Sequence, residues 1–177
     1  MKNRLLIFLF ILFGLNGFAQ KSQIQIAKNS LGKLQASIAS KSDHKKQLAI
    51  IGEGIKAIDA AQKDKKTKNW PETWAIKAYL SSYTSLIEDN ASNAEKHYNL
   101  AVEAIEQANK IDKFQDNSGL IKAPTNNINI KKQTEGNNAF DRNDFQTAFD
   151  LLKQVSDYLP ADTTLAINVA LCAQNIK

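Results

Sequence analysis

The residues that could do chemistry are few in this chain, and they do not form a known catalytic pattern. The chain has two histidines, His44 and His97, and neither has a cysteine, histidine or acid at metal-ligand spacing. No G-x-S-x-G segment and no glycine-rich phosphate loop is present. Paired acids such as Glu103 and Glu106 are typical of a helix surface in solvent. The sequence therefore predicts a non-enzymatic protein without a cofactor or metal, with both histidines on exposed helix surface; a hydrolase is a distant alternative.

Cys172 is the only cysteine, so no internal disulfide can form and stability must come from packing. Its neighbours Ala170, Leu171 and Ala173 favour a buried position, where a cysteine behaves as a small apolar residue. The alternative is a thiol that pairs with another molecule in an oxidising compartment.

The first nineteen residues differ from the rest of the chain. Lys2 and Arg4 give a positive start, Leu5 to Leu15 are almost wholly apolar, and Gly17 and Ala19 supply small residues before Gln20. This pattern predicts a signal peptide over residues 1–19 and an exported protein, periplasmic or envelope-associated, with secretion as the alternative. An uncleaved anchor is the alternative, but the apolar run has roughly half of the ~20 residues that span a bilayer.

The remaining composition favours an all-helical soluble protein. Of the 177 residues, 43% are apolar and 23% charged, with only seven glycines and three prolines. Loss of residues 1–19 removes two positive charges and no negative one, so the formal net charge falls from +5 to +3. An exported protein of that charge is not expected to bind nucleic acid, and no membrane span is expected after cleavage.

Apolar residues recur three and four apart along most of the chain, which predicts amphipathic helices. The expected helix pairs cover residues 22–66, 71–112 and 128–160, and a final helix covers 162–176. Asp43 and Asp162 are expected to cap helices, and Pro71 to begin one. Residues 114–127 contain glycine, proline and asparagine turn signals, so a loop is expected there, followed by a helix from about Ile128.

The second helix of each expected pair repeats the same pattern at a spacing of 47 residues. Small, aliphatic and small positions follow one another in each copy: Gly54, Ile58 and Ala61; Ala101, Ile105 and Ala108; Ala148, Leu152 and Val155. Three copies in one register indicate a helical repeat array.

These residues resemble the tetratricopeptide repeat, a 34-residue helix hairpin. Gly136, Ala148 and Pro160 match its glycine, second-helix alanine and final proline, while Leu152 is a conservative replacement. The middle repeat matches at Trp74, Ala78, Ala101, Ile105 and Ala108. Lys132, Glu135 and Ala139 depart from the motif's first helix, and Lys113 replaces the middle proline. The 47-residue spacing would also suit HEAT-type repeats, which rank second.

The resemblance implies a concave groove lined by the first helices. The positions carried over by register are Glu72, Ala75, Tyr79 and Ser82 in one repeat, Gln133, Asn137 and Phe140 in the next, and Asn168 in the final helix. The aromatic residues would give apolar contact, and the amides would bond a peptide backbone. Gln133 replaces the lysine of the family's carboxylate clamp, so a C-terminal carboxylate ligand is not favoured.

The sequence thus predicts an all-α, right-handed superhelical array of about three helix hairpins plus a C-terminal helix, over residues 20–177. Its expected function is to bind a protein or peptide partner in the bacterial cell envelope. The alternative is a structural helical-bundle subunit without a peptide groove. The final helix has apolar residues and lacks a second helix, which leaves three interpretations: it is the cap of the array, the array continues across a partner or a second copy of the chain, or the chain is a shortened repeat protein. A partner or a shortened chain is favoured.

Overall fold

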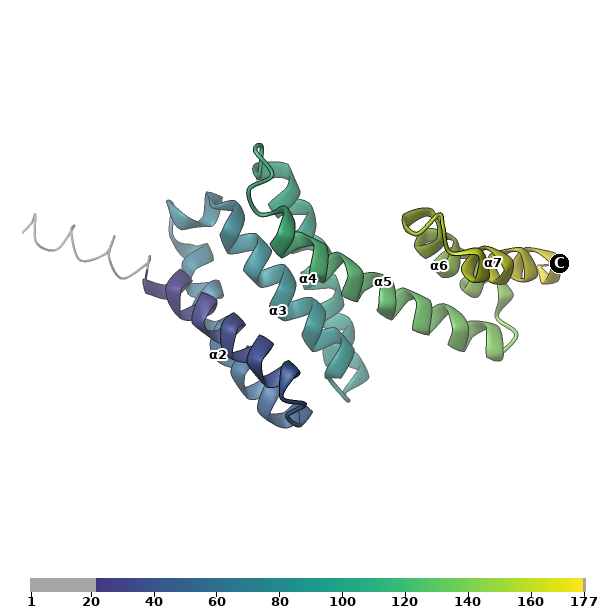
Figure 1. Cartoon of the computed structure of the whole chain (residues 1–177), viewed down its shortest axis with the longest axis horizontal. Helices are drawn as coiled ribbons and strands as arrows, with labels where there is room; N and C mark the ends of the chain where they lie inside the picture. The colour runs from purple at the N-terminus through teal and green to yellow at the C-terminus, as the bar shows by residue number, and fades with distance from the viewer. Residues whose placement is uncertain (1–21, 177) are drawn as a thin grey trace, which may run out of the picture. The chain divides into compact units, whose positions relative to one another are not determined.

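The computed structural model describes residues 22–176, and within that range the chain is all-helical, as predicted (Figure 1). The expected signal peptide lies outside the described residues. A helix over residues 22–39 is followed by α2 (His44–Lys63), the short 3₁₀ helix η1 (Thr67–Asn69), α3 (Pro71–Ile87), α4 (Ala91–Ile111), α5 (Ser118–Asp141), α6 (Phe145–Tyr158) and α7 (Thr163–Asn175). None of the helices described is long and apolar enough to cross a membrane.

Short polar side chains determine where four of these helices begin. A carboxylate or amide oxygen accepts a hydrogen bond from a backbone N–H that the first turn leaves unpaired. Four helices are capped in this way: α2 by Asp43, α4 by Asn90, α6 by Asp144 and α7 by Asp162. The predicted caps at Asp43 and Asp162 and the predicted start at Pro71 are confirmed.

The chain divides into two compact units, and the boundary falls inside α5, after Pro124. In unit 1, α3 lies between α2 and α4 (Figure 1). One side of α3 joins a core that the helix over 22–39 and α2 complete, with Leu34, Ile58 and Leu80 fully buried. Its other side packs on α4 and the start of α5, where Ala75 meets Ala108 and Ile121. The helix α3 is therefore the centre of unit 1.

A glycine in α2 brings the helices of unit 1 close together. A Cβ on Gly54 would lie 2.8 Å from Leu80 Cδ1 and 3.0 Å from Ser30 Cβ, closer than side chains normally pack. Gly52, two positions before Gly54, has open space around it. Of these two glycines in α2, only Gly54 is needed for a close approach.

Unit 2 consists of the later part of α5 with α6 and α7. Residue numbers rise along α5 while those of their partners on α6 fall. Asn126 accepts a hydrogen bond from Tyr158, and Lys132 donates one to Gln154. Further along, a Cβ on Gly136 would lie 2.8 Å from the Cγ and Cδ2 atoms of Leu152. The helices α5 and α6 are therefore antiparallel and cross closely at this glycine.

The prediction of a loop over residues 114–127 is wrong for most of that stretch, because α5 begins at Ser118 rather than near Ile128. Asp112 accepts hydrogen bonds from the N–H groups of Asp116 and Asn117, which orders the turn before the helix. Ile121 then packs into the core of unit 1. Pro124 lacks an N–H and removes one helical hydrogen bond, but this tertiary packing keeps the segment helical.

The predicted repeat pattern falls on the packed faces of α2, α4 and α6. Eight of its nine positions are buried and Ile105 is half-buried. Trp74 is half-buried and donates its indole N–H to the Lys68 carbonyl at 2.7 Å, while Ala78 is fully buried. Pro160 is exposed and follows the end of α6 at Tyr158. These positions are packed in the structure, and the membership of the pattern in a superhelical array stays a prediction.

Candidate functional site

The predicted groove positions on α3 lie inside unit 1. Ala75 and Ser82 are fully buried, and the Ser82 hydroxyl donates to the Tyr79 carbonyl at 3.0 Å. Tyr79 packs against the core, and Glu72 forms an ion pair of 2.6 Å with Lys28 on the first helix. Two of these four side chains are thus covered by their neighbours and offer no surface to a ligand.

In unit 2, three predicted positions come together at one concave site. A hollow of about 250 Å³ is lined by Asn137, Phe140, Asp141, Leu152, Asn168 and Leu171. We call it the unit 2 hollow. Asn137, Phe140 and Asn168 were predicted from the sequence, whereas Asp141 and Leu171 were not. Gln133 is half-buried on α5 and does not line this hollow.

The helix arrangement explains why these side chains meet. Leu152 on α6 is buried and forms the floor of the hollow, packed against Gly136 of α5. The N-terminus of α6 and the C-terminus of α7 share a second, shallower hollow, lined among others by Phe145 and Asn175. Thus α7 is antiparallel to α6, as α5 is, and α5 and α7 run in the same direction along the two sides of the hollow.

The polar side chains of the unit 2 hollow have no side-chain partners among the residues that the structure describes. Asn137, Asp141 and Asn168 form no side-chain hydrogen bond or ion pair with any residue in the described range 22–176. Each carboxamide carries two N–H donors and one oxygen acceptor, and the carboxylate is an acceptor only. The site therefore presents unused donors and acceptors beside apolar walls.

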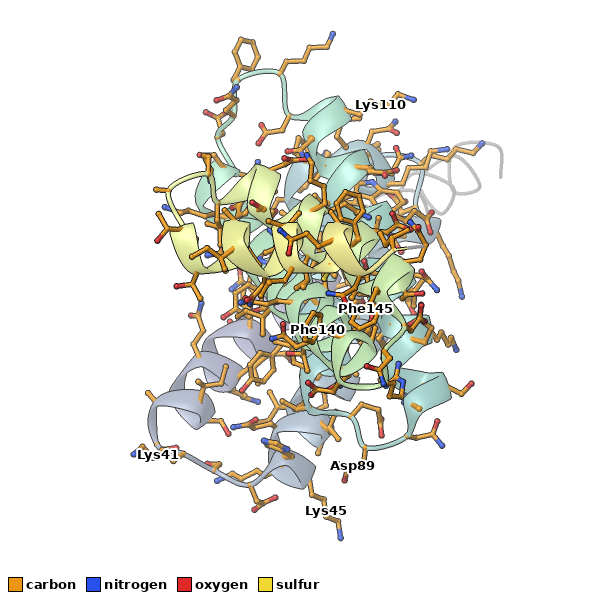
Figure 2. The ribbon with its side chains drawn as sticks, turned by 90° about the vertical axis from the view of Figure 1, so that its right-hand side faces the viewer. Lys41, Lys45, Asp89, Lys110, Phe140 and Phe145 are labelled. Atoms are coloured by element: carbon orange, nitrogen blue, oxygen red, sulfur yellow. The ribbon has the colours of Figure 1, made fainter. Side chains whose placement is uncertain are left out.

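An aromatic contact holds one wall of the hollow in place. The rings of Phe140 and Phe145 meet edge to face, with centroids 5.3 Å apart and planes at 76° (Figure 2). This is a favoured aromatic geometry, and it joins the end of α5 to the start of α6 across the turn. The turn itself is tight, and Asn143 adopts a positive φ of 62° there, which asparagine tolerates. The Phe140 wall is thus fixed by the fold.

The sequence carries a signal for Asp141 and Leu171, the two lining residues that were not predicted. Asp141 stands one helical turn after Asn137. Leu171, which the sequence placed only among the neighbours of a buried Cys172, stands three residues after Asn168. In both cases the residue shares a helix face with a predicted groove position.

His97 differs from its prediction, because it is half-buried rather than exposed, whereas His44 is exposed. The Nδ1 atom of His97 is buried and has no hydrogen-bond partner among the described residues. Burial lowers the pKa of His97, and the cations Lys96 and Lys77 lower it further, while the anions Glu88 and Asp59 partly oppose them. No group of three potential metal ligands occurs in the described range.

Cys172 is buried in the core of unit 2, as predicted. Burial raises the pKa of its thiol, so the reactive thiolate is disfavoured in the folded protein. On the outer side of the same helix, Ile167 is 60% exposed. Self-association through α7 stays a prediction.

Comparisons of the chain with protein-family models, with curated proteins and with solved structures find no match. The tetratricopeptide resemblance therefore rests on the residues alone.

Proposed function

We propose that this chain is a non-enzymatic scaffold of the bacterial cell envelope that holds an extended peptide segment of a partner protein. The unit 2 hollow is the proposed binding site. One observation carries the proposal: Asn137, Asp141 and Asn168 come from two helices, have no partner in the described chain, and surround an apolar floor. The envelope location rests on the sequence of residues 1–19.

A peptide suits this hollow better than a rigid small molecule. Peptide groups need a donor and an acceptor each, and the carboxamides of Asn137 and Asn168 supply both. The volume of about 250 Å³ lies below the roughly 300–1,000 Å³ of sites that enclose drug-sized ligands. The hollow therefore suits one side chain and its adjoining backbone, with further residues of the peptide lying along the surface.

Unit 1 supports a different role, that of a structural bundle. Its central helix α3 has buried residues around its circumference, among them Thr73, Ala75 and Leu80. A helix covered on all sides cannot line an open groove. We therefore assign ligand binding to unit 2 and a supporting role to unit 1. This assignment replaces the predicted groove, which included positions on both α3 and α5.

Selection from a peptide library tests the proposal. The full chain would be immobilised and exposed to a library of random peptides displayed on phage, and the double variant Asn137→Ala/Asn168→Ala would serve as the comparison. We expect the wild-type chain to enrich peptides that the double variant binds at least about tenfold more weakly, since two hydrogen bonds are lost.

Asn138→Ala is the matched control, because Asn138 is exposed, neighbours Asn137 and does not line the hollow. This variant should bind the enriched peptides as the wild-type chain does. Equal retention of all peptides by the wild-type chain and the double variant would show that the hollow is not the binding site.

A further inference from the structure

We infer that the unit 2 hollow selects a peptide with a lysine or arginine side chain, whose cation is received by Asp141. This inference rests on the proposed function and adds the chemical class of the ligand. Asp141 is the one charged residue among the six that line the hollow.

The charge of Asp141 is not balanced by an ion pair within the described residues. Elsewhere in unit 2, Lys131 pairs with Glu135 at 2.7 Å and Lys153 with Asp157 at 2.6 Å. Arg142 follows Asp141 in the chain but forms no ion pair with it in the described range. A carboxylate that lines a hollow without a paired cation attracts a cationic ligand group.

The apolar walls fit the rest of such a side chain. Lysine carries four methylene groups between the backbone and the charged group, and arginine carries three. These methylene groups pack well on apolar surface. Phe140 and Leu171 lie in the same hollow as Asp141, and Leu152 lies beneath them. A hollow lined by apolar side chains and one carboxylate suits a side chain with a long apolar stem and one cation.

The spacing of the polar groups gives the register of the peptide. Asn137 and Asp141 are four residues apart on α5, which is about 6 Å at 1.5 Å per residue. An extended peptide advances about 3.3 Å per residue, so this distance corresponds to two residues. The cationic residue is thus expected two positions from the peptide group that the asparagines bind.

The same residues disfavour an anionic ligand. A carboxylate bound between Asn137 and Asn168 would lie near Asp141, and no cation lines the hollow to offset the repulsion. Gln133, at the position where a lysine would serve a carboxylate, is neutral and lies outside the lining.

The test uses synthetic octapeptides that are acetylated and amidated, with one position fixed in turn as lysine, arginine, norleucine, glutamine or glutamate. Norleucine matches the lysine stem without the charge. We expect the full chain to bind lysine or arginine peptides about fivefold more tightly than norleucine peptides at low salt, the upper range for an accessible ion pair. The preference should fall below about twofold when salt rises from about 0.05 M to about 0.5 M.

The variant Asp141→Asn should lose the preference for lysine while its affinity for norleucine peptides stays unchanged. Asp150→Asn is the control, since Asp150 is exposed on α6, bonds Gln146 and does not line the hollow. A lysine preference that persists in Asp141→Asn, or binding without any lysine preference, overturns the inference and leaves the proposed function standing. Absence of binding for every peptide, with wild type equal to Asn137→Ala/Asn168→Ala, overturns both.

Discussion

Replacing Gly54 by alanine tests the close helix contact at this position of α2 in unit 1. The new methyl group would lie 2.8 Å from Leu80 Cδ1 and 3.0 Å from Ser30 Cβ, and Leu80 is fully buried. Leu80 has little room to move, and the Ser30 Cβ is fixed to its backbone. The helices must therefore separate slightly or their side chains must adopt strained conformations.

Two effects of opposite sign determine the size of the change. Alanine is favoured over glycine inside a helix by about 1 kcal/mol. Overpacking of a well-packed contact typically costs about 1–3 kcal/mol. We therefore expect Gly54→Ala to lower the free energy of unfolding by about 0–2 kcal/mol. Gly52→Ala lies in the same helix with open space around it, so it should raise the free energy of unfolding by about 1 kcal/mol.

Tryptophan fluorescence during denaturation by urea is a suitable assay. The chain has two tryptophans, Trp70 and Trp74, and both belong to unit 1, so the signal reports on that unit even if the two units unfold separately. The informative quantity is the difference between the two variants, which we expect to be about 1–3 kcal/mol. If Gly54→Ala stabilised unit 1 as much as Gly52→Ala does, the close contact at Gly54 would be refuted.

Three further predictions concern other helices. Gly136→Ala should destabilise unit 2 through contact with Leu152, and faster modification of the buried thiol of Cys172 by a thiol reagent would reveal it; an unchanged rate would contradict the crossing. Asp162→Ala removes the cap of α7 and should cost about 1 kcal/mol, measured by the same labelling, whereas no change would show that the cap is dispensable. The folded-state pKa of His97 is lowered from its ordinary value of 6.5, so its neutral form stabilises the fold above that pH, and the stability is lost as pH falls through the folded pKa. His97→Gln should reduce this loss in fluorescence-monitored unfolding between about pH 7.5 and pH 5; an identical pH dependence would count against it.

Local signals in the sequence predicted most helices correctly. Apolar periodicity located α2, α3, α4, α6 and α7, and Asp43, Pro71 and Asp162 fixed three of their beginnings. The start of α5 could not be predicted in this way, because Gly119 and Pro124 are locally signals for a turn. Packing of Ile121 against Ala75 and Ala108, distant in the chain, outweighs those signals.

The candidate site was predicted in part. Register with a known repeat pointed to Asn137, Phe140 and Asn168, and these residues do meet in one hollow. The same register pointed to Ser82, which is buried. Periodicity identifies the residues that share a helix face, but it does not say whether another helix covers that face.

The sequence by itself determined the all-helical class, the caps, and the small residues at which helices cross. These features depend on interactions within a few residues or on a residue's own size, so they can be read along the chain. Only the tertiary structure decided that α3 is covered on both sides while the face between α5 and α7 stays open. Burial of a polar side chain depends on which distant helices pack against it, and that packing left Asn137, Asp141 and Asn168 accessible to a ligand.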